Sequence, residues 1–309
     1  MRWVKKGRVF GIDGDLGWMR SHAQIPTVLP MGDRLRVYFA SRPRPDLSLT
    51  GIVDLDAEDP NRIIEVHPDP VLDVGPPGSF DVHGIMPQYV CRNGDEVWLY
   101  YGGWSRRVEV PYSNWTGLAV SDDDGITFRK AFPGPVIDRT PHEIYSATGC
   151  YILREDDLWH AWYASGTDWL DVDGRLEELY VIKHASSTDG VNWDRENRQL
   201  LPPGPEPEPT HRPTVIEVDG AYHMWFCRRR VRDFRGGAGA YRIGYARSTD
   251  LHHWERDDAS AGIDVSESGW DSTMMAYPYV VKVGDDHLMF YNGNDFGQSG
   301  FGCAVLESS

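Results

Sequence analysis

The sequence predicts an all-β fold: a five-bladed β-propeller with four antiparallel strands per blade, its ring closed by the N-terminal strand. Three observations support this prediction. A strand–turn–strand pattern recurs five times at intervals of roughly 60 residues, a further pair of strand-like segments follows most copies, and no segment has the period of a long helix. Residues 1–309 are therefore expected to form a single domain.

The repeated pattern is a β-hairpin. Each copy has a short apolar strand, a turn of Gly and acidic residues, and an aromatic-rich strand, as in "RPTVIEVDGAYHMWFCRR". The copies agree in order, turn chemistry and aromatic placement, which favours radial blades with few exposed edges over a β-sandwich. They span residues 25–42, 86–104, 148–166, 212–229 and 277–294.

The outer half of each unit has its own pattern. Segments such as "YRIGYARSTDLHHWERD" combine a strand with small residues, a Ser-x-Asp turn and a strand with an aromatic residue, and residues 49–66 are a weaker version. The last hairpin is followed only by "SGFGCAVLESS", which lacks the fourth strand. Residues 2–10, "RWVKKGRVF", begin like the other outer strands, so we expect them to complete the last blade.

Composition and charge restrict the partners. The formal net charge of −16 would repel nucleic acid and anionic membranes, and no stretch approaches the roughly 18 apolar residues of a membrane span. The first residues lack the apolar core of a secretory signal. We therefore expect a cytoplasmic protein, and its oligomeric state stays open. Four cysteines lie in separate apolar runs and are expected as buried thiols rather than disulfides: Cys91, Cys150, Cys227 and Cys303.

Polar residues recur just before the first strand of each predicted blade. In a propeller these positions converge on one mouth of the central channel. Any single residue there could instead cap a turn or bond a backbone carbonyl, but apolar side chains would fill a dry channel at lower cost than five polar sets. The residues are His22, Asp81, His83, His142, Glu143, Tyr145, His211, Arg212, Asp271 and Tyr277.

The hairpin units, the "STDGVNW" and "STDLHHW" turns and the "YRIGYARS" strand resemble the five-bladed glycosidases: family-43 arabinanases and xylosidases, and their invertase and levansucrase relatives. The resemblance covers essentially the whole chain and implies a carbohydrate-active enzyme of glycoside-hydrolase type. That family carries a base Asp, a second Asp and an acid Glu. This chain has Ile25, Gln88 and His211 at those positions, so the resemblance concerns the scaffold and not the triad.

Three other carboxylates at the predicted mouth are the candidate catalytic residues: Asp81, Glu143 and Asp271. Glycoside hydrolysis needs one protonated carboxyl as acid and one ionised carboxylate as base or nucleophile, and separate blades could hold them about 6–10 Å apart. The alternative is that each forms an ion pair with an arginine such as Arg212 and has no catalytic role.

Aromatic and cationic residues suggest how a sugar would bind. Exposed rings stack on the C–H faces of sugars, and Trp104, Trp115 and Trp169 lie in two long segments expected as recognition loops, "GGWSRRVEVPYSNW" and "GTDWLDVDGRLEELY". Arg106, Arg107 and the arginines of residues 228–235 could join Arg212 in binding a phosphate or uronate, although most are equally compatible with a solvated loop. The predicted substrate-binding residues are His22, His83, Tyr145, His211, Arg212, Tyr277, Trp104 and Trp169.

Alternative functions stay open. No cofactor is expected to be required, but His22, His83 and His211 could hold a divalent ion in the central channel, with Glu143 as base. The missing triad favours a non-catalytic glycan-binding propeller. His211 and Arg212 suggest an enzyme acting on a phosphorylated or nucleotide sugar. In each case the expected partner is a carbohydrate.

Overall fold

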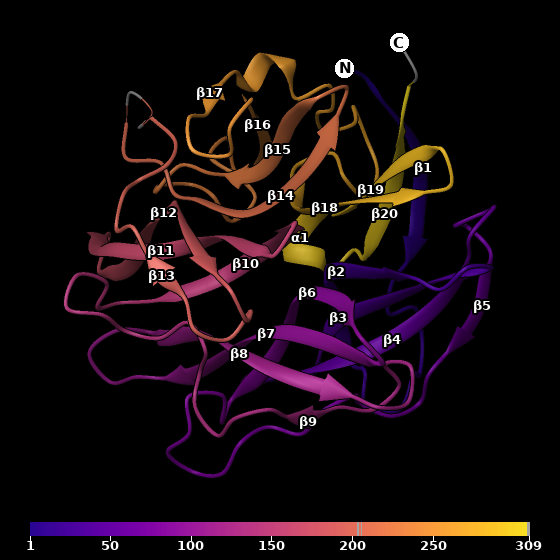
Figure 1. Cartoon of the computed structure of the whole chain (residues 1–309), viewed down its shortest axis with the longest axis horizontal. Helices are drawn as coiled ribbons and strands as arrows, with labels where there is room; N and C mark the ends of the chain where they lie inside the picture. The colour runs from indigo at the N-terminus through magenta and orange to yellow at the C-terminus, as the bar shows by residue number, and fades with distance from the viewer. Residues whose placement is uncertain (203, 205, 308–309) are drawn as a thin grey trace.

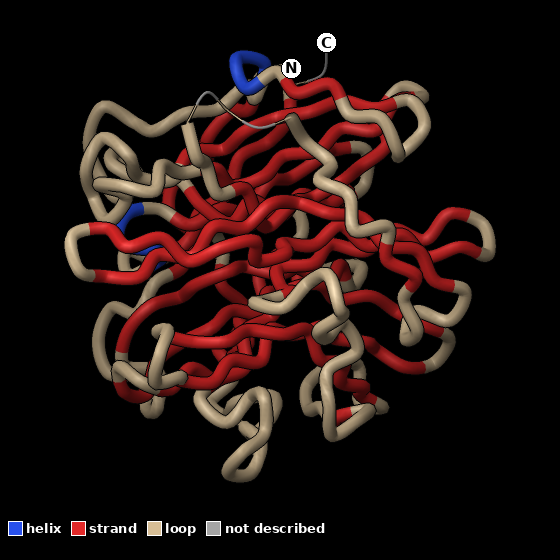
Figure 2. The backbone as a smooth tube through the Cα atoms, turned by 90° about the vertical axis from the view of Figure 1, so that its left-hand side faces the viewer, coloured by secondary structure: helices blue, strands red, loops and turns tan. Residues whose placement is uncertain are grey.

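The computed structural model describes residues 1–202, 204 and 206–307, and these form an all-β structure (Figures 1 and 2). This confirms the predicted fold class. The described helical segments are short: a 3₁₀ turn at Asp258–Ser260 and α1 at Asn294–Gly297. No helix among the described residues is both long and apolar enough to cross a membrane.

Consecutive strands pair antiparallel in meanders, and a tight turn joins the first two strands of each (Figure 1). The first meander contains β2 (Ser21–Pro30), β3 (Arg34–Arg44), β4 (Leu47–Asp56) and β5 (Ile63–Val66). The second contains β6 (Gly84–Asn93), β7 (Glu96–Arg106), β8 (Tyr112–Ser121) and β9 (Arg129–Lys130). The third contains β10 (Ala147–Glu155), β11 (Leu158–Val172), β12 (Arg175–Ser187) and β13 (Asp194–Arg195). The fourth contains β14 (Thr210–Val218), β15 (Ala221–Arg228), β16 (Arg242–Ser248) and β17 (Glu255–Arg256).

The last meander is completed by the beginning of the chain. β18 (Ala276–Val283), β19 (Asp286–Asn292) and β20 (Phe301–Leu306) are joined by β1 (Trp3–Phe10), which pairs antiparallel with β20 from Trp3↔Leu306 onward. The buried Trp3 ring also meets the Trp225 ring edge-on at 5.2 Å. The predicted role of residues 2–10 as the outer strand of the last four-stranded unit is therefore confirmed.

Removing residues 2–10 is expected to destabilise the protein severely and make it aggregate. The deletion exposes the backbone edge of β20 and removes the apolar burial of Trp3. Thermal unfolding and light scattering of the truncated chain would measure both effects. A stable, monodisperse truncated protein would contradict this structural role of β1.

The first strands of the meanders lie at the centre of the molecule. They contact one another in the cyclic order β2, β6, β10, β14, β18 and back to β2. Tyrosine rings pack there, with the Tyr89 ring 5.0 Å from that of Tyr151 and 6.5 Å from that of Tyr279. The outer strands surround this centre (Figure 1).

Each first strand contains an irregularity at the same place. Its pairing with the second strand shifts register after Gln24, Pro87, Thr148, His211 and Ala276 respectively. In β2, β14 and β18 the shifted residue has a positive φ directly before a proline: Ile25 (60°), Arg212 (52°) and Tyr277 (56°). Such backbone costs about 1–3 kcal/mol per residue and persists only where the surroundings enforce it. The bulge therefore recurs at equivalent positions of the five first strands, and these three residues are buried.

The Ser-x-Asp turns are structural. In the turn after β12, the Ser187 hydroxyl accepts the Gly190 N–H at 2.9 Å, and Asp189 accepts the N–H groups of Val191 and Asn192 at 2.8 Å each. Hydrogen bonds from that backbone hold the pKa of Asp189 below its ordinary value. The turns at Ser121 and Ser248 repeat this arrangement, so the motif specifies the chain reversal between the two outer strands.

The cysteines are free thiols, as expected. Cys150, Cys227 and Cys303 are buried and Cys91 is partly buried.

Candidate active site

The three predicted catalytic carboxylates have a common environment. Asp81 is 1% exposed, accepts a hydrogen bond from the Tyr101 hydroxyl at 3.1 Å and lies 2.6 Å from the Lys130 ammonium. Asp271 likewise accepts the Tyr291 hydroxyl at 3.1 Å and lies 2.7 Å from the Lys5 ammonium. In both cases the tyrosine belongs to the second strand and the lysine to the outermost strand of the same meander.

Glu143 repeats this arrangement in the third meander. Its carboxylate accepts the Tyr163 hydroxyl at 3.0 Å and lies 2.6 Å from Arg195 on the outermost strand and 3.2 Å from Lys183. Burial works against ionisation, yet nearby donors and the charges of Arg195 and Lys183 hold the pKa of Glu143 below its ordinary value. The geometry of all three carboxylates favours the ion-pair alternative, with lysines and Arg195 in place of Arg212. Their catalytic role stays a prediction.

Arg212 lies in the core. Its guanidinium donates to the Gln88 carbonyl at 2.5 Å and to the Thr27 hydroxyl at 2.8 Å, and it lies over the Tyr279 ring. Burial lowers the pKa of Arg212 to about 10. No described carboxylate lies within ion-pair distance of it. Arg212 therefore links β14 to β6 and β2 across the centre. These contacts are structural, and its predicted role in substrate binding stays a prediction.

His211 sits among tyrosines. Its ring meets those of Tyr180, Tyr241 and Tyr277 edge-on at 5.0, 5.1 and 5.6 Å. Burial, aided by the charge of Arg229, lowers the pKa of His211 to about 3, so the imidazole is neutral at pH 7. Its buried Nε2 has no hydrogen-bond partner among the described residues. A neutral imidazole with a free nitrogen is suited to bonding a ligand hydroxyl and poorly suited to replacing the family's acid Glu.

Two arginines extend this group, which we call the tyrosine mouth: Gln24, Arg42, Tyr180, His211, Arg229, Tyr241 and Tyr277. Arg229 donates to the hydroxyls of Tyr180 and Tyr241 at 3.1 and 3.0 Å. Arg42 donates to Gln24 at 3.3 Å, and Gln24 donates to the Tyr277 hydroxyl at 3.2 Å. Phenol and amide oxygens thus take the place of carboxylates around both cations.

Glu178 is the titratable residue that the sequence analysis missed. It lies on β12 opposite Trp169, is 3% exposed and accepts the Ser146 hydroxyl at 2.5 Å. Burial raises the pKa of Glu178 to about 7, against the opposing charge of Arg229. Arg229 donates to the Glu178 backbone carbonyl at 3.1 Å, so the backbone at Glu178 lies next to the tyrosine mouth.

The segment that carries Glu178 is a hairpin with one register shift, between Gly166 and Asp168. The expected recognition loop after the third predicted hairpin is a continuation of β11 and β12, paired as far as Val172↔Arg175. Glu177 and Glu178 are adjacent in this extension, and Glu177 pairs with Arg235 at 2.7 Å. Adjacent residues in a strand point to opposite faces, and both glutamates are buried: Glu177 faces Arg235 and Glu178 faces Ser146. Strand alternation would therefore have been the signal that the two carboxyl groups have different surroundings.

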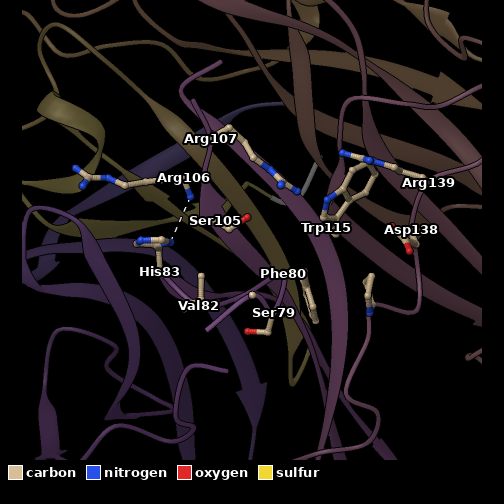
Figure 3. A pocket seen from close by; sticks show the side chains of 12 residues that line it. Ser79, Phe80, Val82, His83, Ser105, Arg106, Arg107, Trp115, Asp138 and Arg139 are labelled. Carbon is tan, nitrogen blue, oxygen red and sulfur yellow. Dashed lines mark hydrogen bonds between the residues drawn. The ribbon is translucent and has the colours of Figure 1, made fainter. Parts of the chain in front are cut away.

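The remaining predicted substrate residues fall into two sets. His22 lies near Arg42 of the tyrosine mouth. Burial, together with the charge of Arg42, lowers the pKa of His22 to about 4. Tyr145 and Trp169 lie beside Glu178. His83 and Trp104 form a separate pair with ring centres 5.6 Å apart, and His83 lines a cavity between the second and third meanders (Figure 3).

Two groups among the described residues have the donors for a metal ion. In one, ligand atoms of His184, Glu196 and His252 lie within 4.8 Å of one another, and imidazole and carboxylate donors suit zinc. In the other, Asp54, Glu65 and His67 are grouped, but Arg36 already pairs with Asp54 at 2.8 Å. His22, His83 and His211, the expected channel ligands, are in neither group.

Comparison with known proteins gives a family and a fold. No family model matches the chain. Two proteins of Mycobacterium tuberculosis, "Uncharacterized protein MT1551" and "Uncharacterized protein Rv1502", are 35% identical to it over 310 residues, covering 100% of both chains.

Solved structures with the same fold are glycoside hydrolases. One "glycoside hydrolase" has a TM-score of 0.76 at 16% identity and covers 99% of this chain and 92% of its own. A thermostable family-43 glycoside hydrolase has a TM-score of 0.68 at 14% identity, covering 93% and 89%. An α-L-arabinanase of Penicillium chrysogenum, complexed with arabinobiose, has a TM-score of 0.60 at 12% identity, covering 99% of each chain. The predicted resemblance to family-43-type glycosidases is confirmed at the level of the fold.

Proposed function

The chain belongs to the family of these two mycobacterial proteins, and from this premise and the shared fold we propose that it is a carbohydrate-active enzyme of glycoside-hydrolase type. The proposed scaffold is a five-bladed propeller. The cyclic contacts of the first strands and the bulge repeated in each of them support five blades. The proposed substrate is a glycan or glycoside that binds at the tyrosine mouth.

The observation that carries this proposal is the raised pKa of Glu178 beside the tyrosine mouth. A glycosidase needs a carboxyl that is still protonated near neutral pH to donate to the leaving oxygen, and burial is how enzymes achieve this. Glu178 has that burial and a pKa of about 7. Aromatic rings and the free His211 nitrogen nearby supply apolar and polar contacts for a sugar.

A panel of oligosaccharides and activated aryl glycosides tests the proposal. If Glu178 is the acid, replacing it should lower the turnover of oligosaccharides more than the turnover of activated aryl glycosides, because a good leaving group needs little protonation. Absence of turnover on the whole panel would contradict it.

A second candidate, a non-catalytic glycan-binding protein, is favoured by one observation. Hydrolysis needs two carboxyl groups, and Asp81, Glu143 and Asp271 are each held in a buried ion pair. This alternative would be established if the protein binds a sugar without turning it over and Glu178→Gln leaves the sugar affinity unchanged.

His211→Ala is expected to weaken sugar binding about threefold to tenfold. The substitution removes a neutral hydrogen bond from Nε2, and such a bond contributes roughly 0.5–1.5 kcal/mol. Titration calorimetry with a bound oligosaccharide would measure the change. His142→Ala, at an exposed position before β10, is the control and should leave affinity unchanged. Equal effects of both substitutions would place the ligand elsewhere.

A further inference from the structure

A cavity of about 450 Å³ lies between the second and third meanders, apart from the tyrosine mouth (Figure 3). We call it the arginine pocket. Its walls come from the segment before β6, the end of β7, the middle of β8 and the segment before β10. The residues used below are Ser105, Arg106, Arg107, Trp115, Asp138 and Arg139.

Arg107 is oriented by one hydrogen bond. Its Nε donates to the Ser113 hydroxyl at 3.0 Å, and that hydroxyl is 3.0 Å from the Ser105 hydroxyl. Figure 3 shows the side chain extending toward Trp115. The terminal nitrogens of Arg107 form no hydrogen bond or ion pair with the described residues. They are therefore available to a ligand.

Arg139 approaches Trp115 from the other side (Figure 3). Its guanidinium carbon lies 5.3 Å from the centre of the Trp115 ring. In the described part of the chain, Arg139 has no carboxylate within 4.0 Å. Stacking on an aromatic face leaves the in-plane N–H groups of an arginine free to donate.

Arg107 and Arg139 form no ion pair with the described residues, although the Asp138 carboxylate lines the same cavity. The formal net charge is −16, and many arginines of the described residues are ion-paired, including Arg36, Arg195 and Arg256. Arg106 differs from its neighbour: it extends away from the pocket (Figure 3) and lies 3.8 Å from Asp46. Two guanidinium groups facing one cavity repel each other unless an anion lies between them.

The other walls suit a sugar. Phe80 is partly exposed and provides aromatic surface, whereas Trp115 is 3% exposed and serves as the support for Arg139. The Ser79 and Ser105 hydroxyls are polar. Asp138 also lines the pocket without an ion pair to Arg107 or Arg139. A carboxylate in that position accepts hydrogen bonds from ligand hydroxyls, which a simple inorganic anion lacks.

We propose that the arginine pocket binds the carboxylate or phosphate group of an acidic sugar, held between the guanidinium groups of Arg107 and Arg139. Planar guanidinium groups match both anions with paired N–H bonds. This inference rests on the proposed function for the sugar part of the ligand only. The sequence suggested an anion-binding role for Arg106, Arg107 and the arginines of residues 228–235 together with Arg212; the proposal keeps Arg107 and adds Arg139.

Titration calorimetry with glucuronate, glucose 6-phosphate, glucose and inorganic phosphate tests the proposal. At least one acidic sugar should bind about tenfold or more tightly than glucose, since hydrogen bonds to charged groups contribute roughly 1.5–3 kcal/mol. The comparison of glucuronate with glucose 6-phosphate identifies the anion. Affinity should fall with added salt, because the site is open to solvent.

Arg107→Ala and Arg139→Ala should each weaken acidic-sugar binding about tenfold or more, and Arg139→Lys should restore part of the loss. Arg106→Ala is the matched control and should change affinity less than about twofold. All these arginines are exposed, so unfolding temperatures should stay unchanged. Acidic sugars binding no more tightly than glucose, or equal losses for Arg106→Ala and Arg107→Ala, would overturn the proposal.

The same experiment separates this inference from the proposed function. Glu178→Gln should leave acidic-sugar affinity unchanged, since Glu178 belongs to the third meander's hairpin and does not line the arginine pocket. Anion binding without any glycoside turnover would remove the enzymatic proposal and keep this one. Turnover of neutral glycosides with no anion binding would do the reverse.

Discussion

Glu143→Gln is expected to lower the free energy of unfolding by about 3–5 kcal/mol, the range found when one partner of a buried ion pair is removed. The side chains of Lys183 and Arg195 are 8% and 7% exposed, and both face the Glu143 carboxylate. A neutral amide leaves these two cations buried without a counter-charge. Chemical denaturation at neutral pH would measure the loss.

Asp13→Asn is the matched control. Asp13 forms an ion pair with Arg8 at 2.6 Å, but its side chain is 70% exposed, so its loss should cost less than about 1 kcal/mol. A Glu143→Gln protein that keeps its stability and loses glycoside turnover would reverse the argument. It would show Glu143 to be the catalytic carboxylate that the sequence predicts.

Glu178→Gln is expected to reduce glycoside turnover at least about a hundredfold, the usual contribution of a positioned acid. Because the acid must be protonated, wild-type turnover should fall as the pH rises through about 7, the pKa of Glu178. The variant has no group to ionise there, so its residual activity should not show this decline. A pH–rate profile of both proteins would measure the two effects.

Glu178→Gln should raise the stability of the protein at pH 8 while it lowers turnover. The pKa of Glu178 is raised from 4.5 to about 7, so its contribution is fully present below the unfolded pKa and is lost as the pH rises through 7. Glutamine cannot ionise, and at pH 8 the variant should be more stable by on the order of 3 kcal/mol. Gain of stability with loss of turnover is a signature that a structural role would not give.

Glu177→Gln is the control for both measurements. Its carboxylate is adjacent in sequence but pairs with Arg235 at 2.7 Å. The variant should keep its turnover and should not become more stable at pH 8. Unchanged turnover in Glu178→Gln would remove Glu178 from the catalytic proposal.

The architecture could be predicted from sequence because the information is local and repeated. Alternating strands and the hydrogen bonds of the Ser-x-Asp turns lie within a few residues of one another, as at Ser187 and Asp189. Even the distant pairing of β1 with β20 could be predicted, because the repeats show which strand is missing.

The roles of the polar residues could not be predicted in the same way. Asp81 precedes a first strand and His211 lies at the start of one. Asp81 is neutralised by Lys130, which lies 49 positions further along the chain, while His211 is surrounded by Tyr180 of β12, Tyr241 just before β16 and Tyr277 of β18. Such partners depend on how strands pack in three dimensions. The depth at which Glu178 is buried depends on Ser146 and Arg229, which no local pattern connects to it.

The pairing of β1 with β20 has a consequence for biosynthesis. The ribosome makes β1 about 290 residues before β20, which at 5–20 residues per second is a delay of roughly 15–60 s. During that interval the earlier meanders can fold, but β1 has no partner strand and the Asp271 carboxylate that Lys5 will neutralise does not yet exist. Until β20 is made, the nascent chain therefore carries β1 as an unpaired strand, and a chaperone that binds extended segments can cover it during that interval.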